Sequence, residues 1–414
     1  MSYGWKKLQK WMGVMGAAVL MLVCAIAFAD IAKAETTGDW EGAKKAIIKA
    51  YKDYETEVDV SSYNLNYKTE YEYLQSTMST VVNETPYLFY ADTRYSVSRN
   101  SSTNQIMKIG LGYTAEYKKT DGSVRKTKIK NTRVKLDAAI EEALLNVEPG
   151  MTKVEKALVL HDYLVRNTAY TQDTTKQYRL TEVGVFLKNK ANCQGYSLAY
   201  AILMEKVGIP VGFVSSDSMS HTWNRIKIGN YWYHVDVTWD DPGDAYLSQD
   251  QYGYVSHANF LCSDAKIIKT GHSDFSSYDS ANTKYDSKYW HGVTGSFYYR
   301  EGKWLYMTKS GVAEREKIVG GKKNILYNIS GNTFVQFNAD KYYFIAYNNI
   351  YMYDYDSNSA EAVWKTSSKY SDEYTLTQIQ YKNGKISYRV LYKKKYKSGT
   401  LTVGSDGKIV ETNS

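Results

Sequence analysis

Apolar residues recur at every third or fourth position in three stretches of the N-terminal half. These stretches, residues 39–55, 136–147 and 154–167, each predict an amphipathic helix with one buried face. Thr152 and Glu155 stand at the spacing of a capping box, which favours the start of the third helix there. His161 lies on the apolar face of that helix, and this placement predicts a buried core histidine rather than a catalytic one.

Strand-like runs lie between the first two helices. We expect strands over residues 87–90 and 106–117, followed by a turn and a basic strand that ends at Lys130. Together with the first helix, they predict an α+β flanking domain over residues 35–135.

The middle of the chain changes to one helix followed by three strands. Residues 193–207 are apolar on nearly all sides, which is typical of a fully buried helix, and Gly208 is expected to end it. Strands are predicted over residues 211–215, 221–228 and 231–239.

From about residue 290 the pattern becomes aromatic and strand-like. Three hairpins are predicted, with turns at residues 301–302, 348–349 and 383–384. They form a degenerate repeat that resembles propeller blades, although three are too few to close a propeller. We expect a small all-β hairpin domain over residues 286–414.

Composition narrows the class of protein. Of the 414 residues, 43% are hydrophobic and 23% are charged, which excludes a disordered chain, a collagen and a polytopic membrane protein. The 41 Tyr and only 4 Pro favour long, regular, half-exposed strands, in which a tyrosine ring packs while its hydroxyl stays in water.

Residues 1–34 have the features of a secretory signal peptide. Lys6, Lys7 and Lys10 precede an uncharged run over residues 11–29, and residues 32–34 offer small side chains at a cleavage site. We therefore expect a mature protein that is secreted or held at the extracytoplasmic cell surface. The uncharged run is also long enough for an uncleaved N-terminal anchor.

The charge of the chain limits its partners. The net charge is +8, of which the signal segment contributes +3 through four Lys and one Asp, and the other lysines are scattered. Nucleic acid is therefore not an expected partner. This charge is compatible with weak, peripheral association with an anionic cell wall or membrane surface.

The expected mature chain has two cysteines, Cys193 and Cys262. Secreted domains held together by disulfides carry many more, so the fold is expected to depend on its core. Cys262 lies in an apolar run and is interpreted as a core residue, and a bridge between the two cysteines is an alternative. Cys193 is either an inert core residue or a nucleophile.

A two-residue loop at residues 229–230 determines how the second and third strands of the middle region pair. Counting back from this loop, His221 lies opposite Thr238. His221 and Asp236 are then diagonal neighbours on one face, roughly 5–8 Å apart at Cβ and within reach of a hydrogen bond. His234 shares the face but lies roughly 13 Å further along the strand.

Cys193 begins the buried helix, and Asn192 is its expected cap. Unpaired N–H groups and the positive end of the helix dipole lower the pKa of a thiol at this position, and the thiolate is the nucleophilic form. Joined to the histidine and the carboxylate, this indicates a triad in which Cys193 attacks, His221 carries the proton and Asp236 orients the ring. Backbone N–H groups of the first helical turn are candidates for an oxyanion hole.

Four ordered motifs resemble the transglutaminase-like superfamily, in particular its bacterial secreted branch. They are C-Q-G-Y-S from residue 193, G-I-P from residue 208, H-T-W-N from residue 221 and W-Y-H-V-D-V-T-W-D-D-P from residue 232. The resemblance covers about residues 150–270. It implies a papain-like α+β core, expected over residues 136–285, in which a Cys-bearing helix packs on an antiparallel sheet that bears the His and Asp.

The resemblance also carries over three catalytic roles: Cys193 as nucleophile, His221 as base and Asp236 as the residue that orients the ring. Animal transglutaminases use a tryptophan indole upstream of the nucleophile in the oxyanion hole, and no Trp lies between Trp40 and Cys193 here. No calcium site of the animal enzymes is evident either. Hydrolysis is therefore favoured over protein cross-linking.

Two tryptophans, Trp223 and Trp239, flank the predicted triad. They are candidates to line a substrate cleft, and packing within the core is the alternative. No cofactor and no metal ion is expected, because no His or Cys cluster has zinc-ligand spacing and no glycine-rich phosphate loop occurs.

The first functional hypothesis is an exported thiol enzyme that attacks an amide or peptide carbonyl, forms a thioester and releases it to water, as a peptidase or amidase does. Its partner is then a protein or peptide substrate, with cell-wall peptide included. One alternative is a transglutaminase that cross-links protein glutamine. The other is a non-enzymatic cell-surface or wall-binding protein that uses its aromatic C-terminal domain.

Overall fold

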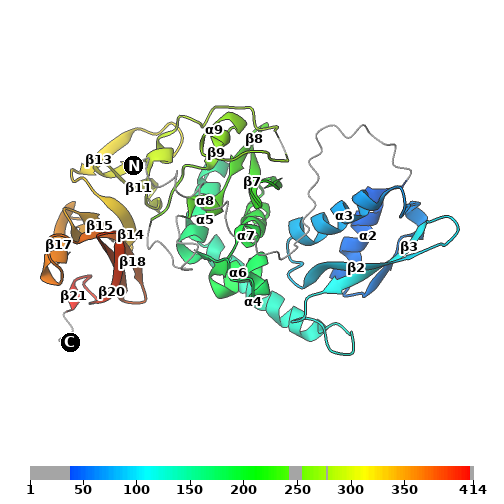
Figure 1. Cartoon of the computed structure of the whole chain (residues 1–414). Coiled ribbons are helices and arrows are strands. Elements are labelled where there is room, and N and C mark those ends of the chain that lie inside the picture. The colour runs from blue at the N-terminus through cyan, green and yellow to red at the C-terminus, as the bar shows by residue number, and fades with distance from the viewer. Residues whose placement is uncertain (1–37, 242–253, 277, 411–414) are drawn as a thin grey trace.

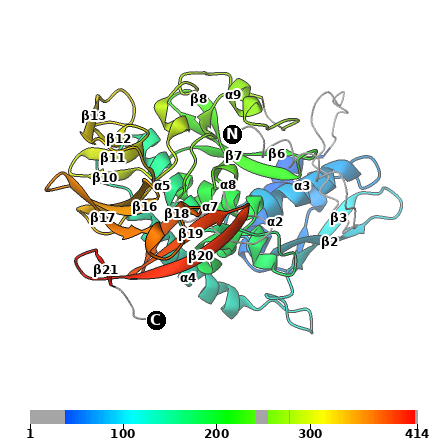
Figure 2. The same ribbon diagram turned by 60° about the vertical axis from the view of Figure 1, so that its left-hand side comes forward.

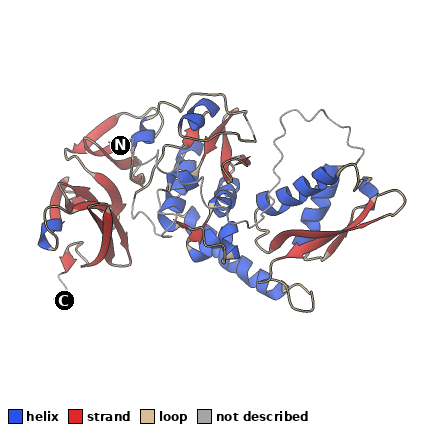
Figure 3. Ribbon diagram, viewed as in Figure 1, coloured by secondary structure: helices blue, strands red, loops and turns tan. Residues whose placement is uncertain are grey.

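The computed structural model describes residues 38–241, 254–276 and 278–410 (Figure 1). The predicted signal peptide and Pro242, the last residue of the fourth motif, lie outside these ranges. Within them, no helix combines the length and the apolar composition needed to span a membrane. Helices and mainly antiparallel sheets form the N-terminal and central parts, and the C-terminal part is almost wholly strands (Figure 3).

The N-terminal part packs two helices on a small sheet. Helix α2 (Trp40–Lys52) confirms the first predicted helix, and its buried face carries Ala43, Ile47 and Tyr51. Helix α3 (Tyr71–Glu84) lies beside it, on the same side of the sheet (Figure 1). The sheet has the order β1-β3-β2, with bounds Glu57–Asp59, Ile106–Tyr113 and Ala91–Arg99.

The strand predicted over residues 87–90 is wrong. Those residues form turns, and β2 begins only at Ala91. Leu88 and Phe89 are buried although they belong to no strand, so the apolar run serves the core and not a sheet. Similarly, β3 ends at Tyr113, four residues before the predicted end.

The predicted basic strand is also wrong over residues 126–130, which form the first turn of a long helix. Helix α4 (Lys126–Leu144) contains these residues and most of the predicted helix over residues 136–147. Ile129, Leu136 and Ile140 are all buried on one side of α4, while the lysines around Ile129 are exposed. Lysines that alternate with other residues resemble the pattern of a half-exposed strand. The helical period becomes visible only when Ile129 is compared with Leu136 and Ile140, which lie further along the chain.

The central part places helices against a four-stranded antiparallel sheet of order β6-β7-β8-β9. Helix α7 packs against β6 and β7, and it confirms the buried helix predicted from residue 193. The capping box of Thr152 and Glu155 is present at the start of α5. The helices are α5 (Lys153–Asn167), α6 (Glu182–Lys188), α7 (Cys193–Lys206), α8 (Val237–Asp240) and α9 (Asp264–Lys269). The strands are β6 (Val211–Ser216), β7 (His221–Ile228), β8 (Tyr231–Val235) and β9 (Phe260–Cys262).

The C-terminal part consists of three consecutive four-stranded antiparallel sheets, each in simple sequence order. The three predicted hairpins are confirmed as β10–β11, β15–β16 and β18–β19, although the second turn is at Tyr347 and Asn348, one residue earlier than predicted. The first sheet is β10 (Tyr298–Arg300), β11 (Lys303–Thr308), β12 (Gly311–Arg315) and β13 (Lys323–Tyr327). The second is β14 (Asn332–Gln336), β15 (Lys341–Ala346), β16 (Asn349–Asp354) and β17 (Ser359–Lys365). The third is β18 (Thr375–Lys382), β19 (Lys385–Tyr392), β20 (Lys395–Val403) and β21 (Ile409–Val410).

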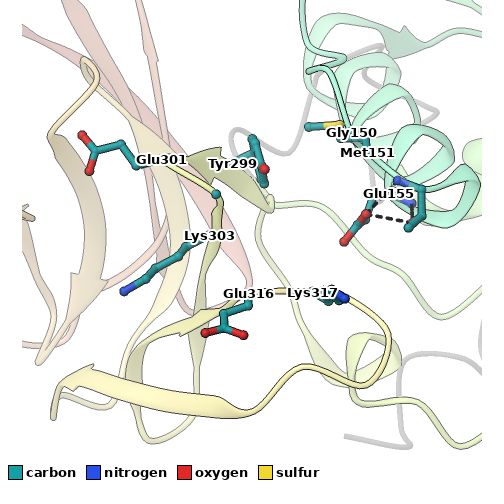
Figure 4. A pocket seen from close by; sticks show the side chains of 10 residues that line it. Gly150, Met151, Glu155, Tyr299, Glu301, Lys303, Glu316 and Lys317 are labelled. Atoms are coloured by element: carbon teal, nitrogen blue, oxygen red, sulfur yellow. Dashed lines mark hydrogen bonds between the residues drawn. The ribbon is translucent and has the colours of Figure 1, made fainter.

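The central part lies between the N-terminal part and these sheets in Figure 1, whereas in Figure 2 the strands β18–β20 are seen in front of the central part. One carboxylate, that of Glu155 on α5, joins the central part to the first sheet. It completes the capping box and also accepts hydrogen bonds from the Trp304 indole at 3.0 Å and the Ile318 backbone N–H at 3.1 Å. Figure 4 shows the pocket on this boundary, lined by Glu155 on one side and by Tyr299 and Lys317 on the other.

A buried charge network joins the same two parts. The His161 ring lies between two carboxylates, with Nδ1 3.0 Å from Asp162 and Nε2 3.1 Å from Asp240. Asp162 also binds His257 at 2.9 Å and accepts from the Phe297 backbone N–H at 2.8 Å. His161 is fully buried, as its place on the apolar face predicts.

The two carboxylates make His161 a charged core residue. Burial alone would lower the pKa of His161, but hydrogen bonds to Asp162 and Asp240 outweigh burial and raise it to about 9. The imidazolium therefore supplies a positive charge that offsets the free-energy cost of burying the two carboxylates.

We predict that stability falls with alkaline pH because of this group. The folded pKa of about 9 exceeds the usual 6.5, so the contribution of His161 is complete below pH 6.5 and is lost as the pH rises through 9. The free energy of unfolding should fall by on the order of 3 kcal/mol over this range. Denaturant unfolding, followed by Trp fluorescence at pH 6 and pH 10, measures the change.

The control is His161→Gln, which should be less stable at pH 6 and should show a flatter pH dependence. Equal pH dependence in the two proteins would contradict a charged His161.

Candidate active site

Cys193 is the first residue of α7, and local packing fixes this helix start. The side-chain oxygen of Asn192 accepts a hydrogen bond from the Gly195 N–H at 3.4 Å, as expected for the cap. A Cβ at Gly195 would lie 2.7 Å from the Arg179 carbonyl oxygen, so the preceding loop packs directly against the first turn. Cys193 is buried with 8% of its surface exposed.

His221 begins β7, and the hairpin brings it towards Asp236. The predicted register is confirmed from Ile228 opposite Tyr231 back to Asn224 opposite Val235. The structure then departs from the prediction, because β8 ends at Val235 and residues 237–240 form helix α8. His221 therefore does not pair with Thr238 across the strands.

Asp236 itself causes this early end of the strand. Its side chain caps α8 by accepting the Trp239 backbone N–H at 3.1 Å. Its other carboxylate oxygen lies 2.7 Å from Nε2 of His221. The contact expected from strand pairing is present, but the carboxylate reaches the ring from a helix cap.

The thiol of Cys193 is the third group at this site. It lies close enough to the His221 side chain and to the Thr222 backbone N–H for both to lower its pKa. Because Nε2 of His221 faces Asp236, Nδ1 is the nitrogen left for the thiol. The structure thus brings Cys193, His221 and Asp236 together in one line of contacts.

The pKa shifts in this line favour a thiolate–imidazolium pair. Burial would raise the pKa of Cys193, but the hydrogen bond and charge of His221 outweigh it and lower the pKa below the usual 9.0. Burial would lower the pKa of His221, but the charge and hydrogen bond of Asp236 and then the thiolate raise it to about 10. The two imidazoles beside Asp236 overcome its burial and hold the pKa of that carboxyl well below 3.8.

One of those two imidazoles, His272, was not identified from the sequence. Its Nε2 lies 2.8 Å from the Asp236 oxygen that also binds His221. It follows α9 on a segment after the last motif, and no spacing rule connects it to Asp236. The sequence feature that draws attention to His272 is the small number of histidines, six in the whole chain.

The two predicted cleft tryptophans have different surroundings. Both indoles stack on the His221 ring, each with centroids 5.4 Å apart. Trp223 is only 1% exposed and donates its indole N–H to His234 at 3.0 Å, so it packs in the core and does not line an open cleft. Trp239 is half-buried and remains a candidate for substrate contact.

The two cysteines are not bridged. Cys262 is fully buried on β9, where its thiol donates to the Ala258 carbonyl at 3.3 Å. Burial raises the pKa of Cys262 well above 9.0, whereas the pKa of Cys193 is lowered. The pKa values of the two thiols are therefore shifted in opposite directions.

Two groups in the described part of the chain bring possible metal-ligand atoms within 4.8 Å of one another. In each, a single Asp carboxylate already accepts hydrogen bonds from two imidazoles at 2.7–3.0 Å. Hydrogen bonding alone accounts for both arrangements. The groups are His221, Asp236 and His272, and His161, Asp162 and His257.

Comparison with known proteins shows that one family model matches this region of the chain. Residues 143–237 match the family model described as the transglutaminase-like superfamily, and the match includes Cys193, His221 and Asp236. Among solved structures, a crystal structure of a TGase is 18% identical, with a TM-score of 0.24; the similarity covers 35% of this chain and 44% of that chain. No curated protein matches the chain.

We predict that iodoacetamide alkylates Cys193 at pH 6 at least about tenfold faster than Cys262, because only Cys193 has a lowered pKa. Peptide mass spectrometry after timed quenching measures the two rates separately.

His221→Gln separates thiolate formation from access to the reagent. This variant should slow the alkylation of Cys193 at pH 6 and leave the alkylation rate of Cys262 unchanged. Equal and slow labelling of both cysteines in the native chain would exclude an activated thiolate.

Proposed function

We propose, from the transglutaminase-like superfamily domain at residues 143–237, that this protein is a thiol enzyme acting on amide or peptide carbonyls. The observation that carries the proposal is the continuous contact from the Cys193 thiol through His221 to Asp236. An inert core cysteine needs neither a histidine partner nor a lowered pKa.

The proposed reaction has two halves. The Cys193 thiolate attacks the carbonyl carbon, His221 gives its proton to the leaving amine, and a thioester forms. Water then attacks the thioester while His221 takes a proton from it, which releases an acid and restores the thiol. Asp236 keeps Nε2 of His221 protonated, so that Nδ1 serves the reacting groups.

Backbone donors at the start of α7 are proposed to stabilise the oxyanion. The first N–H groups of a helix have no intrahelical acceptor, and Cys193 holds the first position. Tyr170 lies near Cys193. Its short strand β4 (Ala169–Tyr170) pairs with β5 (Lys190–Ala191), which ends two residues before Cys193. Burial and the charge of Cys193 raise the pKa of Tyr170 to about 12, so its hydroxyl is neutral at physiological pH.

We assign the core to the papain-like arrangement on its own geometry. A helix begins with the nucleophile and packs on the antiparallel strand that begins with His221. Hydrolysis is preferred over transamidation, because the chain has no Trp between Trp40 and Cys193 to act as the animal enzymes' indole does.

The proposed setting is outside the cytoplasm. The features of residues 1–34 support export, and the mild positive charge supports peripheral contact with an anionic cell surface. The proposed substrate class is therefore a protein or peptide, with cell-wall peptide as a specific candidate.

The non-enzymatic alternative depends on aromatic rings of the C-terminal part being available to sugars. Most of those rings have a packing role, since Tyr342, Tyr343, Tyr353 and Tyr388 are fully buried. Tyr347 and Tyr396 are exposed and are the rings that a wall-binding role would use.

We predict that the purified chain cleaves an amide in at least one of three substrate sets, and that Cys193→Ala abolishes the activity. The sets are unmodified peptides, glutamine donors with a primary amine, and wall-derived peptides. Mass spectrometry separates hydrolysis from amine incorporation. Undiminished turnover by Cys193→Ala would exclude the thioester route, and incorporation exceeding hydrolysis would favour the cross-linking alternative.

We predict that Asp236→Asn lowers kcat/KM by about 100-fold or more, because the amide no longer stabilises the imidazolium. The His221 pKa of about 10 depends mainly on the Asp236 charge, so the alkaline limb of the pH profile should move to lower pH in the variant. A kcat/KM profile between pH 5 and pH 11 measures both effects. An unmoved alkaline limb would show that another group sets it.

A further inference from the structure

His272 is a buried histidine to which neither the motifs nor the proposed triad gives a role. It has 1% of its surface exposed, and its ring centroid lies 4.1 Å from that of Trp239 and 4.7 Å from that of Trp223. Its Nε2 is 2.8 Å from Oδ2 of Asp236, the atom that also lies 2.7 Å from Nε2 of His221.

The hydrogen bonds around His272 determine its charge. A carboxylate only accepts, so Nε2 of His272 must donate to Asp236. On the other side, Nδ1 lies 3.2 Å from Oγ1 of Thr270, and Thr270 donates its single hydroxyl proton to the Ile267 carbonyl at 2.7 Å. Oγ1 can then only accept from Nδ1. A ring that donates from both nitrogens is an imidazolium.

We infer that His272 is a positively charged positioning residue, which shares the Asp236 carboxylate with His221 and limits how strongly Asp236 holds the His221 proton. This inference rests on the proposed Cys–His–Asp function. The two rings are 5.9 Å apart between centroids, so each opposes the positive charge of the other. His272 thereby fixes the carboxylate and keeps the His221 proton available to the leaving group.

Among the described residues, charged groups face this pair from several elements. Asp236 faces both rings from the cap of α8, and Cys193 faces His221 from the start of α7. In the adjoining loops, Asp217 and Asp274 are near enough for each to affect the other. Arg179 adds a positive charge near Tyr170, and Tyr170 in turn interacts with Cys193. His272 thus places a second imidazolium beside the negative charge of Asp236.

The test uses His272→Gln and His272→Ala in the full chain, with His234→Gln as the matched control. His234 is an equally buried histidine that contacts Trp223 and Asp264. The rate of Cys193 alkylation by iodoacetamide is measured from pH 4 to pH 10, which needs no substrate. Gln at position 272 can still donate a hydrogen bond but carries no charge, so the two variants separate the hydrogen bond from the charge.

We expect the apparent pKa of Cys193 to rise by at least about half a unit in both His272 variants and to stay unchanged in His234→Gln. Loss of the positive charge leaves Asp236 less compensated, and its negative charge disfavours the thiolate. A wild-type profile in His272→Gln would overturn the charged role and leave only a hydrogen-bond role.

Histidine-labelled NMR of the native chain gives a second measurement that does not depend on folding of any variant. His272 should show protons on both ring nitrogens at pH 7, and a singly protonated ring would overturn the inference. Failure to find turnover on any substrate, together with the expected alkylation shift, would contradict the proposed function and not the role of His272.

Discussion

The proposed active site depends on one buried carboxylate, that of Asp236. It binds His221 and His272 through one oxygen and caps α8 through the other. A buried carboxylate is stable only when its charge is balanced and its lone pairs are filled, and these three donors meet both conditions. The same contacts orient the imidazole that faces Cys193, so one arrangement both stabilises the carboxylate and orients the His221 ring.

Helix α8 connects this arrangement to the rest of the molecule although it has only four residues. Asp236 caps its start within the site, and Asp240 at its end binds His161 on α5. Asp240 also accepts hydrogen bonds from the backbone and side chain of Asn259. A displacement of α5 would therefore be transmitted to the cap, because neither carboxylate can lose its partners without a large cost in free energy.

The first of the three C-terminal sheets attaches to the central part through the same kind of contact. Glu155 receives donors from Trp304 and Ile318, and Asp162 receives the Phe297 N–H, so α5 carries both attachment points. The sheet β10–β13 thus packs on the central part through these two carboxylates. Polar groups this deeply buried specify one orientation more strongly than an apolar surface would.

The sequence by itself determined the features that arise from neighbouring residues: the capped start of α7 at Cys193, the capping box at Thr152, and the register of the hairpin around residues 229–230. These depend on local hydrogen bonds and on a period that a few residues define. Tertiary structure alone decided that the lysine-rich run joins α4 and that His272 reaches the site. Each of these depends on contacts between segments far apart in the chain, and such contacts exist only once the core has packed.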